Sequence, residues 1–387
     1  MAITMINAAT NTQTVLSNQR VIDMADKIYL LEPNAAPLYV LVSKLNKRVA
    51  ISTTVEWLED ELNPSWSTLR AYASAADTGL SASHNYFNVY DLVKVPSTGE
   101  VVLVTALCAS LTGITVTRAV GDTTSATSAA SAADIVIIGS AFAEGSSGTD
   151  LKVLTTQTAR KFNYLQIFRK AVEITKTLAN SELYGGDDRS YQRKKKGIEL
   201  MRDLERSFLF GEKTEDTASP RRTTGGIDEF ISTNSTNANG TLTETEFEGF
   251  LRTLFRYGSN SRYLFSAPIV LSVISMWAQG KLQMFPKDKT YGIAINQYIS
   301  PHGTINLVKE LMLENAGGVS STSNYGGYAF AVELEEVVYR YLQNRDVQFE
   351  TDIQSPGDDF YMDQYICEIG LEFHQERKMG VLTGVTG

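Results

Sequence analysis

Few of the 387 residues combine side chains of a type and spacing that catalysis or metal binding requires. The three histidines, His84, His302 and His374, have no cysteine, histidine or paired carboxylate at ligand spacing, so they predict no zinc site. The two cysteines, Cys108 and Cys367, lie far apart and allow at most one disulfide. The chain also lacks the G-x-x-x-x-G-K-[ST], H-E-x-x-H and G-x-S-x-G motifs. We therefore predict no catalytic, cofactor-binding or metal-binding residues and no enzymatic activity.

Two clusters of carboxylates are the remaining candidates for acid–base or calcium chemistry. They are "EWLEDE" at residues 56–61 and "SPGDDFYMD" at residues 355–363. A calcium loop needs regularly spaced ligands and a glycine at its bend, and neither cluster provides that arrangement. We favour solvated charges or salt bridges between subunits, with metal binding or catalysis as the alternative.

A basic stretch, "YQRKKKGIELMRDLERSFLFG" at residues 191–211, raises the question of nucleic-acid binding. With the two residues before it, this stretch carries seven positive and three negative side chains. Its apolar residues recur at helical spacing and predict a helix over 188–210: Ile198, Met201, Leu204 and Phe208. Because successive helical residues turn by about 100°, Lys194, Lys195 and Lys196 point in different directions. We favour an amphipathic helix with a solvated basic end, and keep direct DNA contact and subunit salt bridges as alternatives.

The composition is that of a folded, acidic protein. Hydrophobic residues make up 43% and charged residues 20%, which is typical of a globular chain of two or three domains at this length. The formal net charge of −9 argues against a dedicated nucleic-acid binder, because such affinity comes from many lysines and arginines that neutralise phosphates. No signal-peptide pattern opens the chain, and no apolar run approaches the roughly 20 residues that span a bilayer. We expect a cytoplasmic protein with no membrane partner.

The first half of the chain predicts an arm, a long extended segment and a small β module. Residues 1–18 are uncharged, and a short helix is predicted at 19–31. A strand-like acidic segment follows at 51–66, and short β-rich runs between turn residues indicate an all-β module at 85–148. Residues 162–178 are expected to return antiparallel to the acidic segment, which makes the module an insertion between two legs. Because a two-stranded ribbon is marginal in water, we expect it to rest on the remaining chain or on a neighbouring copy.

The second half predicts a compact α/β subdomain followed by further strands. Thr243 and Glu246 form a capping box that opens an amphipathic helix, and Pro268 suits the first position of a second helix. Between them, residues 262–266 are predicted to form a strand. Near the C-terminus, residues 363–377 alternate so that one face is expected to be buried and the other largely polar.

The order of these pieces resembles the tailed-bacteriophage major capsid proteins with the HK97-like (Hong Kong 97) fold. The resemblance rests on six segments in this order: "VEWLEDEL", "DIVIIGSAFAEGS", "NYLQIFRKAVEITKTLANS", "YQRKKKGIELMRDLERSFLFG", "PRRTTGGIDEFI" and "DQYICEIGLEFHQERKMGVL". It implies an α+β chain divided as follows: an N-terminal arm at 1–50; an extended loop at 51–180 with an inserted β module at 85–148; a peripheral domain at 181–225 with a spine helix at 188–210; an axial domain at 226–330; and a return to the peripheral-domain sheet at 331–387.

In the family that this chain resembles, the function is self-assembly. The resemblance therefore implies hexamers and pentamers in a closed icosahedral shell around a phage genome. The expected partners are further copies of the chain, portal and scaffold proteins, in some members cementing proteins, and packaged double-stranded DNA in passive or weak contact. The expected location is the virion capsid, after assembly in the host cytoplasm. The alternatives are an encapsulin-like compartment shell, a cytosolic α/β enzyme with an appended β domain, and an acidic adhesion or decoration protein.

Overall fold

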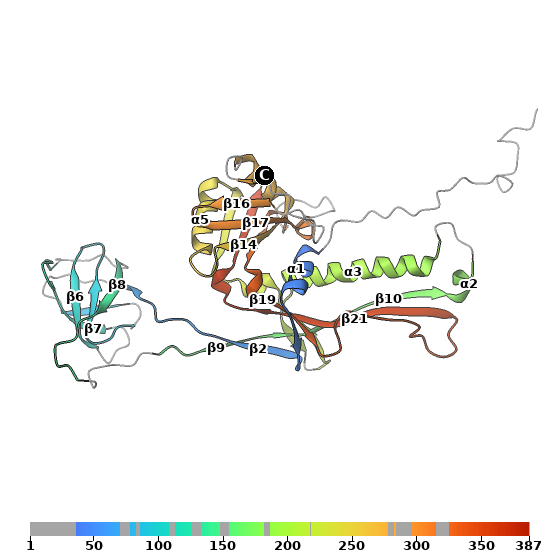
Figure 1. The fold of residues 1–387 in the computed structure, drawn as a ribbon, viewed down its shortest axis with the longest axis horizontal. Helices are drawn as coiled ribbons and strands as arrows, with labels where there is room; N and C mark the ends of the chain where they lie inside the picture. The colour runs from blue at the N-terminus through green and yellow to red at the C-terminus, as the bar shows by residue number, and fades with distance from the viewer. Residues whose placement is uncertain are drawn as a thin grey trace, which may run out of the picture. The chain divides into compact units, whose positions relative to one another are not determined.

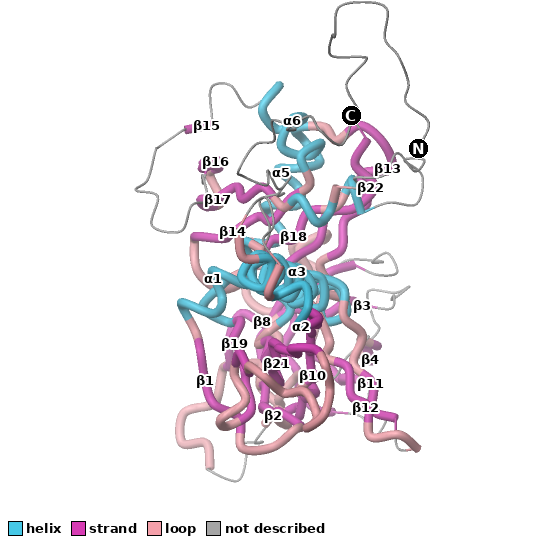
Figure 2. The backbone as a smooth tube through the Cα atoms, turned by 90° about the vertical axis from the view of Figure 1, so that its right-hand side faces the viewer, coloured by secondary structure: helices cyan, strands magenta, loops and turns pink. Residues whose placement is uncertain are grey.

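The computed structural model shows two compact units, one formed by Met1–Trp57 with Lys161–Gly387 and the other by Leu58–Arg160. Figures 1 and 2 show the elements of each unit. The structure describes residues 36–69, 78–82, 86–107, 113–125, 133–147, 155–181, 186–216, 218–277, 282–283, 296–314 and 325–386. The helix predicted at 19–31 lies outside these residues, as do His84 and Cys108.

The first sheet of the larger unit is built around β10 (Gln166–Thr175) and β21 (Phe360–Phe373), which pair antiparallel over the whole of β10. β19 (Val337–Leu342) pairs antiparallel with β21, and β1 (Lys47–Ala50) pairs in parallel with β19. A short strand, β20 (Gln348–Glu350), also pairs antiparallel with β21. The result is a mainly antiparallel sheet of five strands.

The long helix α3 (Asp188–Phe210) contacts β10 and β21 and runs along them (Figures 1 and 2). The predicted helix therefore has the observed bounds, but its predicted apolar face is wrong in one position. Met201 is 44% exposed. The side chains that face inward on this part of the helix are those of Leu200, Leu204 and Glu205. The helix and sheet are close together, since a Cβ added at Gly197 would lie 3.4 Å from the Tyr365 ring.

The second sheet of the larger unit has seven strands in the order β13-β22-β18-β14-β17-β16-β15. Their bounds are β13 (Ser235–Thr241), β14 (Ser261–Ser266), β15 (Leu282–Gln283), β16 (Asn296–Ser300), β17 (Gly303–Lys309), β18 (Ala329–Val332) and β22 (Gly380–Thr386). The predicted capping box is confirmed at the start of α5 (Glu244–Leu254), where Thr243 and Glu246 bond each other's backbone N–H. Pro268 begins α6 (Pro268–Trp277), as predicted. A single apolar cluster runs from this sheet through α3 to the first sheet.

Short elements complete the larger unit and its connection to the second unit. They are α1 (Pro37–Leu45), α2 (Lys176–Ala179), α4 (Ile227–Phe230), the 3-10 turns η3 (Leu311–Leu313), η4 (Tyr325–Gly327), η5 (Leu334–Glu336) and η6 (Glu376–Lys378), the β11 (Thr214–Asp216) and β12 (Arg221–Thr223) pair, and the β2 (Thr54–Glu59) and β9 (Ala159–Tyr164) pair. The β2–β9 pair is the ribbon through which the chain leaves the larger unit and returns to it.

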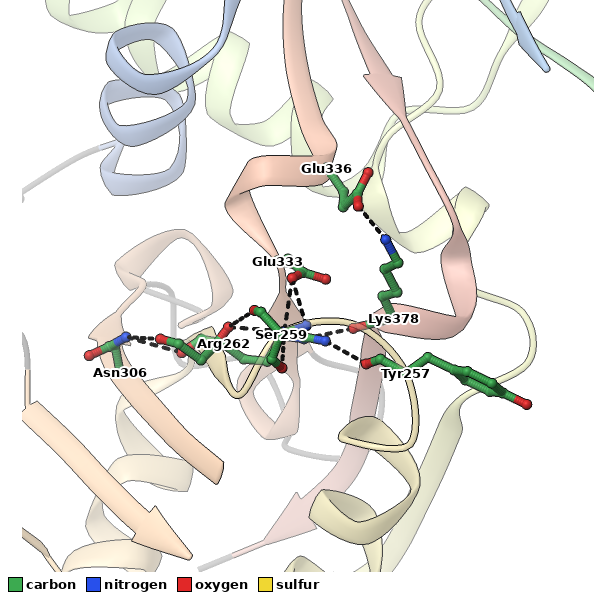
Figure 3. A network of polar contacts seen from close by, with 8 residues as sticks. Tyr257, Ser259, Arg262, Asn306, Glu333, Glu336 and Lys378 are labelled. Carbon is green, nitrogen blue, oxygen red and sulfur yellow. Dashed lines mark hydrogen bonds and ion pairs between the residues drawn. The ribbon is translucent and has the colours of Figure 1, made fainter. Parts of the chain in front are cut away.

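Two of the passages of the chain between the two sheets run through η5 and η6, and a buried arginine ties these two crossings together (Figure 3). Arg262 in β14 is fully buried, and its Nη1 lies 3.2 Å from Glu333 Oε1 just before η5. Its Nε donates to the Lys378 carbonyl in η6 at 2.9 Å, and its Nη2 donates to the Tyr257 carbonyl at 2.7 Å. Lys378 in turn forms an ion pair with Glu336 in η5. Charge and hydrogen bonds therefore hold both crossings to β14.

The second unit is a small antiparallel barrel. Its strands follow the order β3-β8-β5-β6-β7-β4, and a bridge between Leu69 and Ala82 joins the first strand to the last. Their bounds are β3 (Trp66–Leu69), β4 (Gly79–Ser81), β5 (Asp91–Lys94), β6 (Val101–Leu107), β7 (Gly113–Thr117) and β8 (Ala133–Ser140). The barrel has its own apolar core, and Arg118 and Glu100 form a buried pair with two contacts of 2.6 Å. Closure removes the free sheet edges that a small β module would otherwise expose.

The observed boundaries differ from the predicted insertion at 85–148. β3 and β4 precede residue 85, and they place Leu69 and Leu80 in the barrel core. These strands are only four and three residues long, too short for alternation to reveal them. On the return leg, only β9 pairs with β2, whereas β10 belongs to the five-stranded sheet rather than to the extended loop at 51–180.

Replacing residues 61–157 with a short Gly-Ser linker is expected to leave the larger unit folded, because its apolar core shares no residue with that of the barrel. Near-ultraviolet circular dichroism and chemical denaturation would check this. Deleting only residues 87–140 is expected to cause aggregation, because β3 and β4 then lose their partners β8 and β7. Insoluble protein from the longer deletion would contradict the independence of the two units.

Candidate assembly surfaces

The described residues contain no group of three or more His, Cys, Asp or Glu side chains that could hold a metal ion. Cys367 is a free thiol inside β21, and burial raises its pKa to about 12. His302 is exposed in the turn before β17, and His374 forms a 2.6 Å hydrogen bond with Glu372. No helix in the described part of the chain is long and apolar enough to span a membrane.

Part of the basic end of α3 is neutralised by the sheet against which it packs. Arg189 donates from Nε and Nη2 to the two carboxylate oxygens of Asp363, at 2.8 and 2.6 Å, and Arg193 Nε donates to the same carboxylate at 2.8 Å. The Asp363 side chain is 1% exposed. Burial alone would raise the pKa of this carboxyl, but the two guanidinium groups outweigh burial and hold the pKa well below its usual range. These two arginines are therefore structural and are not available to a phosphate backbone.

The carboxylate cluster at 355–363 is thus only partly solvated. The Asp363 carboxylate is paired with Arg189 of the same subunit. At Asp358 it is the backbone carbonyl that accepts a hydrogen bond, of 2.7 Å from Lys176 Nζ. In the cluster at 56–61, Asp60 accepts a 2.9 Å hydrogen bond from the Thr156 hydroxyl. Sequence reasoning missed the pairing of Asp363. The available signal was the spacing of Arg189 and Arg193, four residues apart and so on one helix face.

The expected polar face of β21 is also buried. Glu368 and Glu372 are 3% and 4% exposed, although they alternate with the apolar residues of the strand. Glu368 lies 3.1 Å from Arg345 Nε, and Glu372 forms an ion pair with Arg340. The second face of β21 is therefore polar, as predicted, but it is covered, because Arg340 of β19 and Arg345 of the turn after β19 compensate the charge of these glutamates.

The three consecutive lysines of α3 differ in their surroundings. Lys196 lies 2.6 Å from Glu199, one helical turn away. Lys194 and Lys195 are exposed, and neither forms an ion pair with any residue that the structure describes. Their charges therefore contribute little to the stability of the helix.

Replacing Lys194, Lys195 and Lys196 with glutamine is expected to change the free energy of unfolding by no more than about 0.5 kcal/mol, because only one ion pair between neighbouring turns of the helix, Lys196 with Glu199, is lost. Chemical denaturation would measure this. Arg193→Gln serves as the control and is expected to destabilise the protein, because it removes a guanidinium from buried Asp363. A loss of stability in the triple variant as large as that of Arg193→Gln would instead show that these lysines hold the helix in place.

The leg of chain that contains β2 carries apolar side chains that the subunit does not cover. Val55 and Trp57 alternate inward and are buried. Ile51, Leu58 and Leu62 are 92%, 69% and 95% exposed. A single exposed leucine needs no explanation, but Leu58 and Leu62 both belong to the second unit and lie four residues apart, which indicates a contact surface. We call Leu58 and Leu62 the ribbon patch.

The barrel carries a second apolar surface on β3 and β8. Trp66 is 53% exposed and lies opposite Val136, so the two side chains share a face. Ile138, two residues further along β8, projects from the same face and is 57% exposed. An outward-facing tryptophan beside an isoleucine is typical of a protein–protein contact.

Comparisons with known proteins identify what this chain is similar to. The family model described as SU10 major capsid protein matches residues 7–386. The capsid of an empty GTA particle matches at 8% identity and a TM-score of 0.50, over 98% of this chain and 100% of that chain. The structure of Mycobacterium phage Bobi matches at 7% identity and a TM-score of 0.50, with the same coverage. The SrpI encapsulin of Synechococcus elongatus matches at 11% identity and a TM-score of 0.40, over 59% of this chain and 78% of that chain. A search of the curated proteins finds no significant match.

The two matches that span the chain bear on the fold. At identities below one tenth they carry no residue roles, but with 98% of this chain covered they show that its fold is a known one. The predicted α+β, HK97-like fold is confirmed.

Proposed function

This chain belongs to the SU10 major capsid protein family, and on that premise we propose that it assembles as hexamers and pentamers into a closed icosahedral head around a phage genome. The family match makes it a structural capsid protein. The observation in the structure that supports self-association is the ribbon patch, whose two leucine side chains are 69% and 95% exposed. Repeated contacts in a closed symmetric assembly would cover this surface in every copy.

The division of labour within the subunit is part of the same proposal. We assign the five-stranded sheet with α3 to the peripheral domain, and the seven-stranded sheet with α5 and α6 to the axial domain. The β2–β9 ribbon is the extended loop, and the barrel is its insertion. The buried Arg262 cluster lies where the chain crosses between the two sheets, so it fixes one domain against the other.

Contact with packaged double-stranded DNA is proposed to be passive. The chain has a net charge of −9, and Arg189 and Arg193 of the basic helix are taken up by Asp363. A wall of this kind neutralises few phosphates, so the DNA keeps its own counterions. Portal, scaffold and, in some assemblies, cementing proteins are the further proposed partners. The proposed location is the virion capsid, after assembly in the host cytoplasm, and we propose no enzymatic role.

Electron microscopy of the purified chain, and of particles that contain it, tests the proposal. Closed shells with six-fold and five-fold capsomers that enclose nucleic acid are the expected result. A chain that stays monomeric or dimeric under all assembly conditions, and never occurs in particles, would overturn it. Shells that enclose an enzyme and no genome would support the encapsulin-like alternative instead.

A further inference from the structure

Helix α1 is capped by a carboxylate from a distant part of the chain. Its N-cap residue, Ala36, offers no side-chain hydrogen bond, and its first turn contains no acidic residue. Instead Glu205 of α3 accepts from Leu38 N–H at 2.9 Å through Oε1 and from Tyr39 N–H at 2.7 Å through Oε2. Glu205 is fully buried. It therefore supplies, from α3, the acceptor that a helix N-terminus requires.

A second buried carboxyl lies beside Glu205. Glu310 follows β17, is fully buried, and is within hydrogen-bonding reach of Glu205. Glu310 Oε1 accepts from Met312 N–H at 2.8 Å, whereas Oε2 is buried and has no partner. Two ionised carboxylates side by side in an apolar core would repel each other, and a buried orphan oxygen is itself unfavourable.

Among the residues that the structure describes, no cation relieves this repulsion, because neither carboxyl forms an ion pair with a lysine, arginine or histidine. The groups that face Glu205 from α1 are the backbone N–H groups of Leu38 and Tyr39, which do not titrate. The Tyr39 ring itself packs against Phe208 and Tyr339. From the second sheet, Ser266 presents its carbonyl, which accepts from Glu310 N–H at 2.9 Å. The charge that acts on Glu205 is that of Glu310.

We propose that Glu205 and Glu310 share one proton and together form a proton-dependent latch that fastens the N-terminus of α1 to α3 and to the segment after β17. The proton lies between the two carboxyl groups. Both oxygens of Glu205 already accept from N–H groups of α1, whereas Oε2 of Glu310 has no other partner and is free to form the hydrogen bond that the proton makes. One proton therefore satisfies the orphan oxygen and removes one of the two negative charges.

The direction of the pH dependence follows from burial. Burial raises the pKa of Glu205, with the charge of Glu310 adding to it, and burial raises the pKa of Glu310. The pKa of the glutamate pair is therefore higher in the folded chain than in the unfolded chain. The stabilisation of α1 by the latch is complete below the ordinary glutamate pKa, and it is lost as pH rises through the raised pKa of the folded state. For each unit by which folding raises the pKa, the equilibrium for opening α1 changes about tenfold across the titration.

Hydrogen exchange of the full chain at increasing pH tests the latch, followed on the peptide that contains α1 and corrected for intrinsic exchange rates. In the wild type, protection of the Leu38 and Tyr39 amides should fall at least about tenfold across the titration. Glu310→Gln should keep protection high at every pH, because the amide always donates to Glu205. Glu314→Gln, an exposed change in the same segment, should behave as the wild type. The inference does not depend on shell assembly, because the isolated subunit is measured.

A wild-type profile as flat as that of Glu310→Gln would overturn the proposal, and so would equal loss of protection in Glu310→Gln and Glu205→Gln at every pH. Infrared spectroscopy of the wild type gives a measurement that needs no variant to fold. It should show a protonated, exchange-protected carboxyl group whose absorption disappears over the same pH range as the protection of the α1 amides, and the absence of that absorption would also refute the shared proton.

Discussion

Replacing Arg262 with methionine is expected to lower the free energy of unfolding by about 3–5 kcal/mol, because it removes one partner of a buried ion pair and leaves Glu333 uncompensated. The guanidinium is fully buried. Besides Glu333 it contacts carbonyl groups of Tyr257, Ser259 and Lys378, which would each lose a donor. Burial lowers the pKa of this guanidinium, and the charge of Glu333 opposes that shift, so the two groups depend on each other.

Chemical denaturation of the subunit would measure the effect. Arg256→Met is the matched control, because Arg256 is exposed nearby and its loss should cost no more than about 0.5 kcal/mol. Arg262→Lys is expected to fall between these two, since an ammonium keeps the charge but cannot reach the same carbonyls with a planar fork. Adding Glu333→Gln to Arg262→Met should recover part of the loss. Equal stabilities of the Arg262→Met and Arg256→Met variants would show that the cluster does not hold the crossings together.

The helices of this fold could be predicted from local signals. The capping box of Thr243 and Glu246 and the first-turn proline of α6 are contained within a few residues, so they mark helix starts without tertiary information. The spacing of apolar residues predicted where α3 begins and ends. It did not predict which side of the helix faces the sheet. Leu200 rather than Met201 faces the sheet, because contacts with β10 and β21 decide which of two adjacent rows is buried.

The long-range features could not be read from the sequence. Residues 166–175 pair with β21, almost 200 positions later, rather than with the leg that precedes them. The cap of α1 is 166 and 167 residues away from the amides that it binds. One signal was present for it: Glu205 lies next to Leu204 in the inward-facing part of α3, where an unpaired acidic residue is out of place. Nothing local marked Glu310 as its neighbour.

The sequence predicted that the ribbon needs a supporting surface, but it did not predict which residues of the ribbon are buried and which stay exposed. The marginal stability of a two-stranded ribbon indicated that it would rest on the remaining chain or on a neighbouring copy. The first is observed, because Val55 and Trp57 are buried in the core of the larger unit. Leu58 and Leu62 stay exposed, and their contact with a neighbouring copy stays a prediction. The difference depends on how far along the ribbon each residue lies, which the alternation of apolar residues does not show.

Replacing Leu58 and Leu62 together with aspartate is expected to abolish shell assembly and leave the subunit folded. The two side chains are 69% and 95% exposed, so the isolated fold loses little. If both become buried against a neighbouring copy, their removal weakens each contact by roughly 3 kcal/mol, which is more than a hundredfold in its association constant. Burying the new carboxylates adds to that loss, and every subunit of a closed shell repeats it.

Size-exclusion chromatography and electron microscopy would separate the two effects, with circular dichroism as the check on folding. Ser52→Asp is the matched control, because it adds a charge to the same exposed leg without removing an apolar side chain, and it should assemble as the wild type. Val55→Asp is the opposite control: it places a carboxylate in the core and should unfold the subunit. Wild-type yields of shells from the Leu58→Asp, Leu62→Asp double variant would remove the ribbon patch from the assembly contacts, and soluble but misfolded protein would show that these leucines support the subunit itself.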